Sequence, residues 1–517
     1  MQIYTKFTKK HYLCAMKCKL CLIIGIAATL LSVKTEAQTM PVPEQEDGFF
    51  PTATPAPKRE VRAVWVTTLS GLDWPKTKAT SEKSREEQKA ELCQILDRLQ
   101  ECHINTIFLQ TRVRGSVIYP SQMEPWDVCL TGRFDKSPGY DPLQFAIEEA
   151  HRRSMELHAW VVTIPCFKIA NAGKMGRKCM TKTHPELLRK LGDTYYADPG
   201  LPGTATYLTR LCHEIVEKYD VDGLHFDYIR YPENAPAFPD GQTFRKYGKG
   251  KKKDEWRRDN VTAIVSTIYK DVKELKPWVR ISCSPVGKYD DLSRYSARGW
   301  AAYSTVHQDA QRWLRDGVMD MLCPMMYFQG DHFYPFAADW QERAYGRTVA
   351  PGLGIYFLHP KERDWEWGVV QRELCYLRQQ QLGGQAYFRS QFLTDNTKGI
   401  YDYLKQDFYP HPALMPAMTW QSDRHPAMPV LTTRQRLQGI NEHLEWQPVE
   451  MDGTPCRYAI YASKKKPVDT ERGENLITVT QNCHYTYNLL SSTLYGLHLA
   501  ITAIDRYGNE SEPLQIP

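Results

Sequence analysis

The feature that most constrains the fold is a regular alternation of short apolar runs with longer amphipathic segments. The runs have the length and the β-branched or aromatic content of strands. A run that is apolar throughout is typical of a strand covered on both faces, as in a parallel sheet with helical connections. The predicted strands are Val61–Thr68, Asn105–Arg112, Glu156–Pro165, Asp222–Tyr231, Val279–Gly287, Met319–Phe328, Thr348–Phe357 and Gly384–Phe392.

Helical patterns separate these runs. Eight strand and helix repeats over about 330 residues match the number and size of a (β/α)8 TIM barrel. An open doubly wound sheet is the alternative, but it favours a glycine-rich phosphate loop after an early strand, and Leu69–Pro75 does not have that composition. Predicted helices include Ser84–Cys102, Asp141–Ser154, Ala205–Tyr219, Asn260–Leu275, Val306–Asp316 and Gly368–Gln381.

Residues 1–37 have the pattern of an export signal. Lysines precede the apolar run Leu20–Val33, and Thr35 to Ala37 offer small residues at the two positions that signal peptidase reads. The run is too short for a good membrane span, so we expect an exported bacterial protein, periplasmic, at the cell surface or secreted, with no transmembrane segment after signal removal. A start at Met16 remains an alternative. Residues 38–58, rich in proline and threonine, are predicted to be a linker.

Charge and cysteine content exclude several classes of protein. Six lysines and one glutamate in residues 1–37 contribute +5 of the formal net charge of +6, which leaves a nearly neutral mature chain without an electrostatic footprint for nucleic acid. Three of the 14 cysteines also lie there, and the remaining eleven are scattered. Without a Cys-x-x-Cys pair or a His-Glu-x-x-His motif in the mature chain, we expect no metal and no cofactor.

The composition changes after the barrel, which is predicted to span residues 59–408. Prolines recur in residues 409–430, a predicted second linker. Residues 431–517 show short alternating runs separated by turn signals, which predicts a small all-β sandwich. An early tryptophan and a tyrosine-rich later half resemble a fibronectin type III module.

The stretch Asp222–Pro232 looks like a barrel strand that opens into a site. Side chains alternate along a strand, so His225 and Asp227 are expected on one face and Phe226 and Tyr228 on the other. A carboxylate on the inward face needs a partner or a purpose, because its ionised form is costly to bury alone. We therefore predict Asp227 as a catalytic group. The structural alternatives are an ion pair with a nearby arginine or a helix cap.

Other polar and aromatic side chains follow the predicted strands. Guanidinium, amide, indole and carboxylate groups on one rim suit a carbohydrate, because planar donors bind hydroxyls and aromatic faces contact sugar rings. Each has a structural alternative, such as core packing for the tryptophans and turn formation for Asp73. The predicted substrate-binding residues are Trp65, Asp73, Trp74, Gln110, Arg112, Trp160, His225, Arg230, Tyr327 and Arg389.

Several segments in a fixed order carry a family resemblance: Val61–Thr68 with Asp73–Pro75, Asn105–Arg112 with Tyr119–Ser121, Gly139–Pro142, Leu157–Trp160, Val221–Asp227, Asp309–Trp313 and Cys323–Tyr327. With these segments, the chain from Glu60 to about Phe392 resembles the glycosyl hydrolase-like family 10. The resemblance implies a TIM barrel that hydrolyses glycosidic bonds, with bacterial cell-wall glycan as one suggested substrate.

The sequence departs from the family pattern at four positions. Tyr228 replaces the second aspartate expected after strand four, and Ser116 replaces an acid expected after strand two. Thr163 or a neighbour replaces an asparagine on strand three, and Met325 or Met326 replaces a glutamine near Tyr327. These departures make a catalytically weak or inactive glycan-binding protein the competing hypothesis.

The predicted reaction is acid/base cleavage of a polysaccharide or peptidoglycan-type glycan by two carboxylates. Asp227 is the nucleophile or one member of the acid/base pair, and its partner is Glu124, Asp290 or Asp331. Carboxyl groups about 5–5.5 Å apart predict retention of configuration, and about 6.5–9.5 Å predict inversion.

Overall fold

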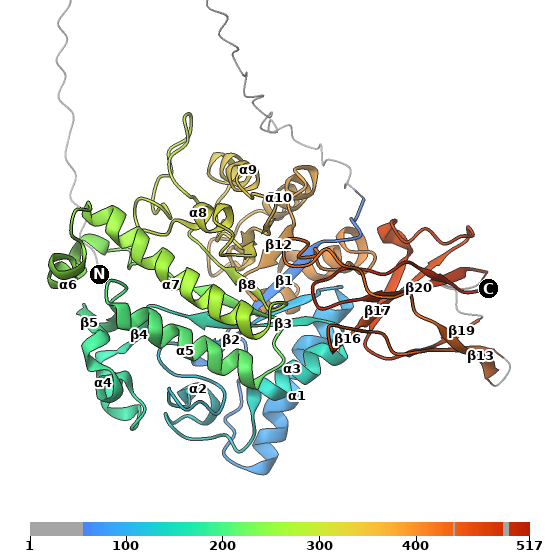
Figure 1. Cartoon of the computed structure of the whole chain (residues 1–517), viewed down its shortest axis with the longest axis horizontal. Coiled ribbons are helices and arrows are strands. Elements are labelled where there is room, and N and C mark those ends of the chain that lie inside the picture. Colours follow the sequence, from blue (N-terminus) through green and yellow to red (C-terminus); the bar gives the residue numbers. More distant parts are fainter. Residues whose placement is uncertain (1–54, 438–439, 490–495) are drawn as a thin grey trace, which may run out of the picture. The chain divides into compact units, whose positions relative to one another are not determined.

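The computed structural model describes residues 55–437, 440–489 and 496–517. The predicted (β/α)8 barrel is confirmed, because each of the eight apolar runs contains a strand of one parallel sheet surrounded by helices (Figure 1). The strands are β1 (Val61–Val66), β2 (Thr106–Arg112), β3 (Glu156–Val162), β7 (Gly223–Asp227), β8 (Arg280–Cys283), β9 (Met321–Leu322), β10 (Thr348–Val349), β11 (Gly352–Leu353) and β12 (Gly384–Tyr387).

The two short strands β10 and β11 are halves of one predicted strand, and together they close the barrel. β10 pairs with β9, whereas β11 pairs with β12. At the break between them, the Ala350 N–H donates to one neighbouring strand and the Pro351 carbonyl accepts from the other. Gly352 is needed there because a Cβ at this position would lie 2.9 Å from the Trp65 side chain. A strand shared between two neighbours thus completes the ring.

Strand side chains alternate between two apolar layers. Outward-facing residues such as Val64, Ile107 and Phe226 pack against the helices. Each large apolar side chain buried in this way stabilises the fold by about 1.5–3 kcal/mol. The inner layer fills the barrel with Val61, Ala63, Trp65, Phe108, Trp160, Val162, Met321, Cys323, Ala350 and Ala386.

The helices of the barrel begin where the sequence supplies caps. Ser81 and Ser84 form a capping box at the start of α1, and Asp141 accepts the first N–H groups of α3. α5 and α7 lie side by side on the barrel (Figure 1). The helices are α1 (Glu82–Glu101), α2 (Val128–Thr131), α3 (Pro142–Arg152), α4 (Met180–Thr183), α5 (Pro202–Lys218), α6 (Gly241–Tyr247), α7 (Lys253–Leu275), α8 (Ala310–Arg315), α9 (Tyr334–Glu342), α10 (Trp367–Gln379), α11 (Ser390–Thr394) and α12 (Ile400–Tyr403).

A small antiparallel sheet is inserted between β3 and α5. Its strands β4 (Pro165–Lys168), β5 (Leu188–Leu191) and β6 (Thr194–Ala197) pair in the order β4-β6-β5. The insertion follows the carboxyl end of β3, so it lies at the end of the barrel where such folds place their sites. We call this end the barrel mouth.

The carboxyl-terminal part is built from antiparallel sheets, which agrees with the predicted all-β domain. One sheet has the order β13-β14-β19, another has the order β18-β17-β20-β21, and β15 and β16 form a hairpin. Side chains of both larger sheets, among them Trp446, Tyr458 and Ile501, share one core. The fibronectin type III-like assignment stays a prediction. The strands are β13 (Leu431–Leu437), β14 (Asn441–Trp446), β15 (Glu450–Met451), β16 (Thr454–Pro455), β17 (Arg457–Ser463), β18 (Leu476–Thr480), β19 (His484–Asn488), β20 (His498–Ile504) and β21 (Leu514–Gln515).

The proline-rich residues 409–430 contact the amino-terminal ends of the barrel strands. The Glu60 N–H donates to the Leu414 carbonyl (2.9 Å), and the Trp420 indole N–H donates to Asp320 (2.9 Å). Frequent proline disfavours helices and central strands, but it does not prevent a segment from packing on its neighbour. The linker boundaries stay predictions.

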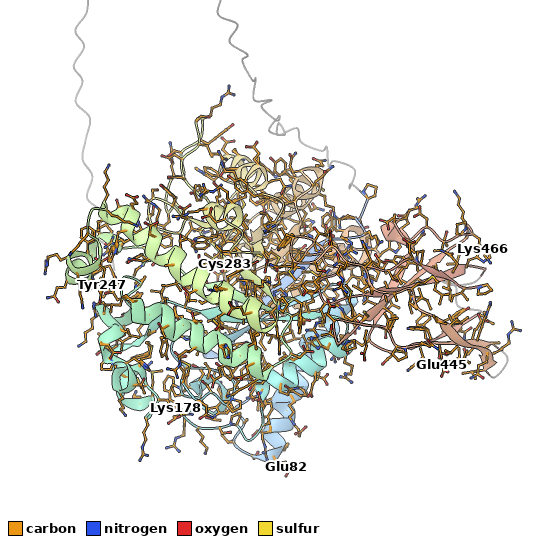
Figure 2. The ribbon with its side chains drawn as sticks, viewed as in Figure 1. Glu82, Lys178, Tyr247, Cys283, Glu445 and Lys466 are labelled. Atoms are coloured by element: carbon orange, nitrogen blue, oxygen red, sulfur yellow. The ribbon has the colours of Figure 1, made fainter. Side chains whose placement is uncertain are left out.

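In the part of the chain that the structure describes, no helix is long and apolar enough to cross a membrane. The predicted signal, residues 1–37, and most of the predicted linker 38–58 lie outside the described residues. Cys283, fully buried in the outer layer between the sheet and the helices, lies near the middle of the molecule in Figure 2, while Glu82, Lys178 and Tyr247 lie at the periphery.

Candidate functional site

Asp227 is the last residue of β7, and its carboxylate is held by three donors at the barrel mouth. Its Oδ1 accepts hydrogen bonds from the Tyr228 N–H (2.8 Å) and the Ser284 hydroxyl (3.3 Å). Its Oδ2 accepts one from the Trp160 indole N–H (3.3 Å). The donors come from β3 and from the residues that follow β7 and β8, so adjacent strands of the barrel position this side chain.

The backbone turns sharply directly after Asp227. Tyr228 has a φ of +51°, in the left-handed region that a bulky residue rarely adopts. Strand alternation predicts Tyr228 beside Phe226 on the outer face, and this prediction is wrong. The turn instead places Tyr228 against the inner cluster at the mouth. A strained residue beside a buried acid is a frequent property of functional sites.

Burial raises the pKa of Asp227 above its ordinary value, although Arg230 and the three hydrogen bonds favour the ionised form. The side chain is only 7% exposed, and no salt bridge to it is formed among the described residues. Arg230 instead donates to Glu233 (2.7 Å) and lies over the Tyr228 ring, 4.7 Å from its centroid. Asp227 therefore retains its proton to a higher pH than an exposed aspartate does.

Glu233 is a second carboxylate at the mouth that the sequence analysis missed. Burial opposes its ionisation, but the charge and hydrogen bond of Arg230 leave the pKa of Glu233 below its ordinary value. The charge of Arg114 acts in the same direction. Burial raises the pKa of Tyr196 in the inserted sheet; the charge of Glu233 raises it further and the charge of Arg114 lowers it. In the sequence, Glu233 could have been found from its spacing, because Asp227, Arg230 and Glu233 follow one another at intervals of three residues.

Glu124, one of the predicted partners of Asp227, forms a buried ion pair within the fold. Arg112 donates to both of its carboxylate oxygens (2.7–3.1 Å), and the Tyr207 hydroxyl donates to one of them (2.8 Å). Both side chains of the ion pair are fully buried. Arg112 also donates to the Thr163 carbonyl (2.8 Å) and thereby ties β2 to β3. We do not carry Glu124 or Arg112 into our proposal, because their polar groups are already used within the fold.

The other two predicted acids lie in surface-facing loops. Asp290 is half-buried and accepts from the Ser304 hydroxyl (2.8 Å), and Asp331 is exposed. Neither is among the groups with the largest effects on the pKa of Asp227. Glu233, in contrast, shares a cation with Asp227, because the charge of Arg230 lowers the pKa of both carboxyl groups.

Trp65 and His225, predicted to bind substrate, lie inside the barrel. The Trp65 indole N–H donates to Nε2 of His225 (3.1 Å), so the proton of the neutral ring is on Nδ1, which faces Ser282 (2.9 Å). The ring of Phe108 stacks on His225 at 4.0 Å. Burial holds the pKa of His225 well below its ordinary value. This neutral layer supports the floor of the mouth.

Asp73, which follows β1, and Arg389, which follows β12, connect the two loops after these strands. Asp73 accepts hydrogen bonds from the Thr67 N–H (2.8 Å), the Gln391 N–H (3.1 Å) and the Arg389 guanidinium. Burial nevertheless raises the pKa of Asp73. Gln110 accepts from the N–H groups of residues 68 and 69 and so supports the same loop.

Trp74 and Tyr327 have different surroundings. Trp74 is fully buried, and its indole N–H donates to the Gln88 carbonyl of α1 (2.8 Å), which makes it a core residue. Tyr327 is half-buried beside Phe388 (5.7 Å between centroids), and after burial and Tyr356 the charge of Asp227 contributes to its raised pKa. Tyr327 therefore stays a candidate mouth residue.

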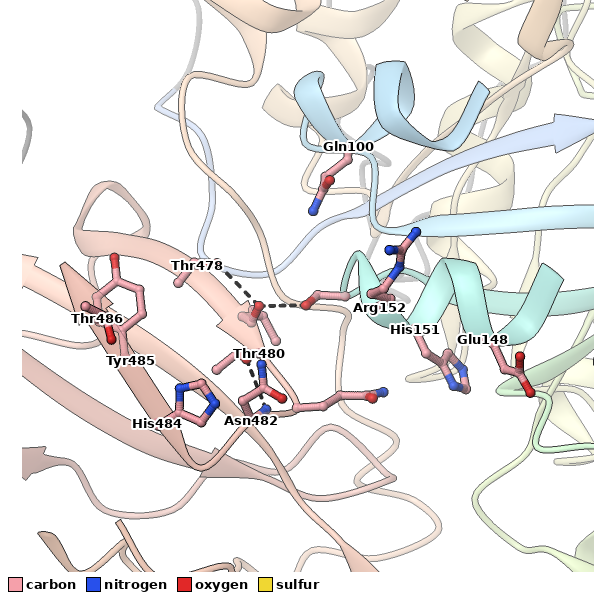
Figure 3. Close-up of a pocket in the computed structure, with 13 residues that line it drawn as sticks. Gln100, Glu148, His151, Arg152, Thr478, Thr480, Asn482, His484, Tyr485 and Thr486 are labelled. Carbon is pink, nitrogen blue, oxygen red and sulfur yellow. Dashed lines mark hydrogen bonds between the residues drawn. The ribbon is translucent and has the colours of Figure 1, made fainter. Parts of the chain in front are cut away.

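In the described ranges, no cluster of three or more histidine, cysteine, aspartate or glutamate side chains could hold a metal ion. A polar groove of about 640 Å³ lies between α3 and the segment in which β18 turns into β19, where the Ser154 hydroxyl donates to the Val479 carbonyl (2.6 Å) (Figure 3). None of the predicted site residues lines it.

Two curated proteins are similar to this chain over different lengths. Glycosyl hydrolase YngK of Bacillus subtilis (strain 168) is 31% identical over 487 residues, which cover 88% of this chain and 92% of YngK. Glycosyl hydrolase DigH of Escherichia coli (strain K12) is 31% identical over 327 residues, which cover 59% of this chain and 74% of DigH.

Solved structures are more distant. The PgaB (BpsB) glycoside hydrolase domain from Bordetella bronchiseptica has a TM-score of 0.43 at 13% identity and covers 67% of this chain and 98% of that chain. The β-amylase catalytic domain from Paenibacillus polymyxa has a TM-score of 0.44 at 11% identity and covers 68% and 99%. The family described as glycosyl hydrolase-like 10 matches residues 60–351. The chain therefore belongs to the glycosyl hydrolase-like 10 family.

Proposed function

We propose that this protein is an exported glycoside hydrolase that cleaves a polysaccharide or cell-wall glycan with Asp227 and Glu233. The observation that carries the proposal is the opposite displacement of the two pKa values at one mouth: that of Asp227 is raised and that of Glu233 is lowered. Two carboxyl groups whose environments separate their pKa values are suited to opposite roles in acid/base catalysis.

Asp227 is the proposed general acid. Its raised pKa keeps a proton available, and its three hydrogen-bond donors hold the carboxyl group in one orientation. Protonation of the departing glycosidic oxygen then assists cleavage of the bond between that oxygen and the anomeric carbon.

Glu233 is the proposed ionised partner. The salt bridge from Arg230 stabilises its charge, and its side chain is 31% exposed, so it remains accessible from solvent. In a retaining reaction Glu233 would attack the anomeric carbon, and in an inverting reaction it would remove a proton from the attacking water. The stereochemistry of the released sugar distinguishes these two roles.

Peptidoglycan-type glycan is the first substrate to test. The test measures product release by mass spectrometry from peptidoglycan strands with and without stem peptides, chitooligosaccharides, α-glucan and β-mannan. Asp227→Asn and Glu233→Gln are compared with wild type, and Asp331→Asn is the matched control on an exposed acid of the same barrel end. NMR of the first product assigns the anomeric configuration.

The expected result is a product released by wild type and Asp331→Asn but by neither mouth variant. If no protein releases product while all bind one glycan, the hydrolase proposal fails and a glycan-binding function replaces it. Equal release by wild type and Asp227→Asn would exclude Asp227 as the acid.

A further inference from the structure

The loop between β8 and α8 rises from the barrel mouth beside Asp227. Ser284, which donates to Asp227, lies just after β8, and the Val286 N–H donates to the Gln308 side chain (3.1 Å) at the other foot of the loop. The Val306 carbonyl accepts from the Tyr231 N–H (3.0 Å), four residues after Asp227. In Figure 1 this yellow-green loop projects beyond the neighbouring helices. Both feet of the loop are therefore joined to the candidate site.

The base of the loop is braced by a buried lysine. Lys288 is 1% exposed, its ammonium group donates to the Arg298 carbonyl, and it lies 4.6 Å from the centroid of the Phe328 ring. The Lys288 carbonyl in turn accepts from the Ala302 N–H (2.8 Å). Burial lowers the pKa of Lys288. Lys288 thus connects the two sides of the loop, and its ammonium group lies against the Phe328 ring.

The loop is also ordered nearer its tip. Asp291 accepts from the Ala297 N–H (2.6 Å), and the Leu292 N–H donates to the Tyr295 carbonyl (2.9 Å). Tyr295 and Leu292 pack partly against the main core. These contacts restrict the loop before any ligand binds, so a side chain presented by it loses little conformational entropy on binding.

Trp300 is the exposed aromatic group on this braced loop. It is 53% exposed, the largest fraction among the large hydrophobic side chains of the described residues. Gly299 precedes it with a φ of +94°, a conformation that favours glycine. A tryptophan offers a wide, rigid apolar face together with a polar indole N–H, which suits the C–H face and the hydroxyl groups of a sugar ring.

We propose that Trp300 is a distal sugar-binding platform, which stacks on a ring of the same glycan chain whose scissile bond lies at Asp227. The inference rests on the proposed function and deepens it, because a platform on a projecting loop selects an extended chain over a disaccharide. Binding energy from Trp300 is therefore available only to substrates long enough to reach from the mouth to the loop.

The test compares Trp300→Ala with wild type and with Tyr345→Ala. Tyr345 is a matched control because it is 50% exposed but lies between α9 and β10, at the amino-terminal end of the barrel. Affinity is measured by calorimetry in the Asp227→Asn background, using N-acetylglucosamine oligosaccharides of two and six sugars and peptide-free peptidoglycan strands. KM and kcat are measured for the same glycan chains with proteins that keep Asp227 unchanged. Trp300→Phe tests rescue by a second aromatic ring.

The platform predicts that Trp300→Ala weakens binding of the long chains about 5- to 10-fold and raises their KM. The affinity of Trp300→Ala for the disaccharide should differ from that of wild type by less than about twofold. The affinities of Tyr345→Ala and Trp300→Phe for the long chains should also stay within about twofold of wild type. Equal affinity of Trp300→Ala and wild type for every chain, or no binding of any chain, overturns the platform. Trp300-dependent binding without cleavage supports the platform while the hydrolase proposal fails, so the two outcomes are distinguishable.

Discussion

Four acids at the amino-terminal end of the barrel and two at the mouth have pKa values shifted in opposite directions. At the amino-terminal end, Glu60, Glu156, Asp222 and Asp320 each precede or begin a strand, and each has a pKa below its ordinary value. At the mouth, Asp73 and Asp227 follow or end a strand, and both have a raised pKa. Burial raises the pKa at both ends, so the difference comes from the partners.

Asp320 shows how the amino-terminal end compensates burial. Lys273 lies 2.8 Å from one carboxylate oxygen, which also accepts from the Ile281 N–H (2.8 Å). The Tyr269 hydroxyl (3.0 Å) and the Trp420 indole N–H (2.9 Å) donate to the other oxygen. Asp227 has three donors but no direct cation, which leaves its ionised form less stabilised. Asp320 is thus compensated by a direct cation and Asp227 is not, although other carboxylates on the mouth side, such as Glu124, are paired with an arginine.

Asp227→Asn is expected to give the largest effect on activity. Loss of the proposed acid should reduce kcat by roughly 10²–10⁴-fold. The free energy of unfolding should stay close to that of wild type, because the ionised carboxylate is not favoured by its surroundings. Product release and thermal melting of the same preparation check both parts. A melting temperature well below that of wild type would contradict the comparison.

Asp320→Asn is the matched change at the other end. It leaves the Lys273 ammonium buried without its carboxylate, and breaking such a pair costs about 3–5 kcal/mol. Urea unfolding should show this loss, while kcat per folded molecule should match that of wild type. A stable variant with reduced kcat would mean that the two ends are not functionally separate.

Arg230→Gln should move the pH profile without removing either proposed acid. Arg230 favours ionisation of both Asp227 and Glu233, so its loss raises both pKa values. The acidic limb of the kcat profile, which requires ionised Glu233, and the alkaline limb, which requires protonated Asp227, should both shift to higher pH. Activity at the original optimum should fall on the order of tenfold. A shift to lower pH would contradict the effect of the Arg230 charge on both carboxyl groups.

His151→Gln tests the amino-terminal end by pH. Nε2 of His151 lies 2.7 Å from Asp222, and although burial opposes it, this carboxylate raises the pKa of His151. The pair therefore stabilises the fold below the ordinary histidine pKa, and that contribution is lost as the pH rises through the raised value. Melting should show a deficit of about 1 kcal/mol near pH 6 that disappears near pH 9. His213→Gln is the control and should change less, because His213 is more exposed than His151 and its partner Asp271, 2.9 Å away, is partly exposed.

The barrel and the position of Asp227 were predictable from the sequence because both follow from local patterns. An apolar run bounded by helical periodicity identifies a strand, and alternation within β7 places Asp227 with His225. The same alternation failed one residue later, at Tyr228, because the chain enters a left-handed conformation there. A pattern rule holds only as long as the strand continues.

The identity of the second acid depended on folding of the loops. Glu124 is twelve residues after Arg112, and only the return of the loop joins them in a buried ion pair. Glu233 was overlooked, although it lies three residues after Arg230, because spacing alone does not distinguish a surface pair from one at the mouth. The partner of a carboxylate is a property of the fold.

By itself, therefore, the sequence determined the eight-strand architecture, the all-β carboxyl-terminal part and Asp227 at the end of a strand, since burial and periodicity are written residue by residue. Only the tertiary structure decided which carboxylates are compensated and which are not. That distinction depends on distances between groups far apart in the chain, and the energy of a buried charge changes steeply with the distance to its nearest counter-charge.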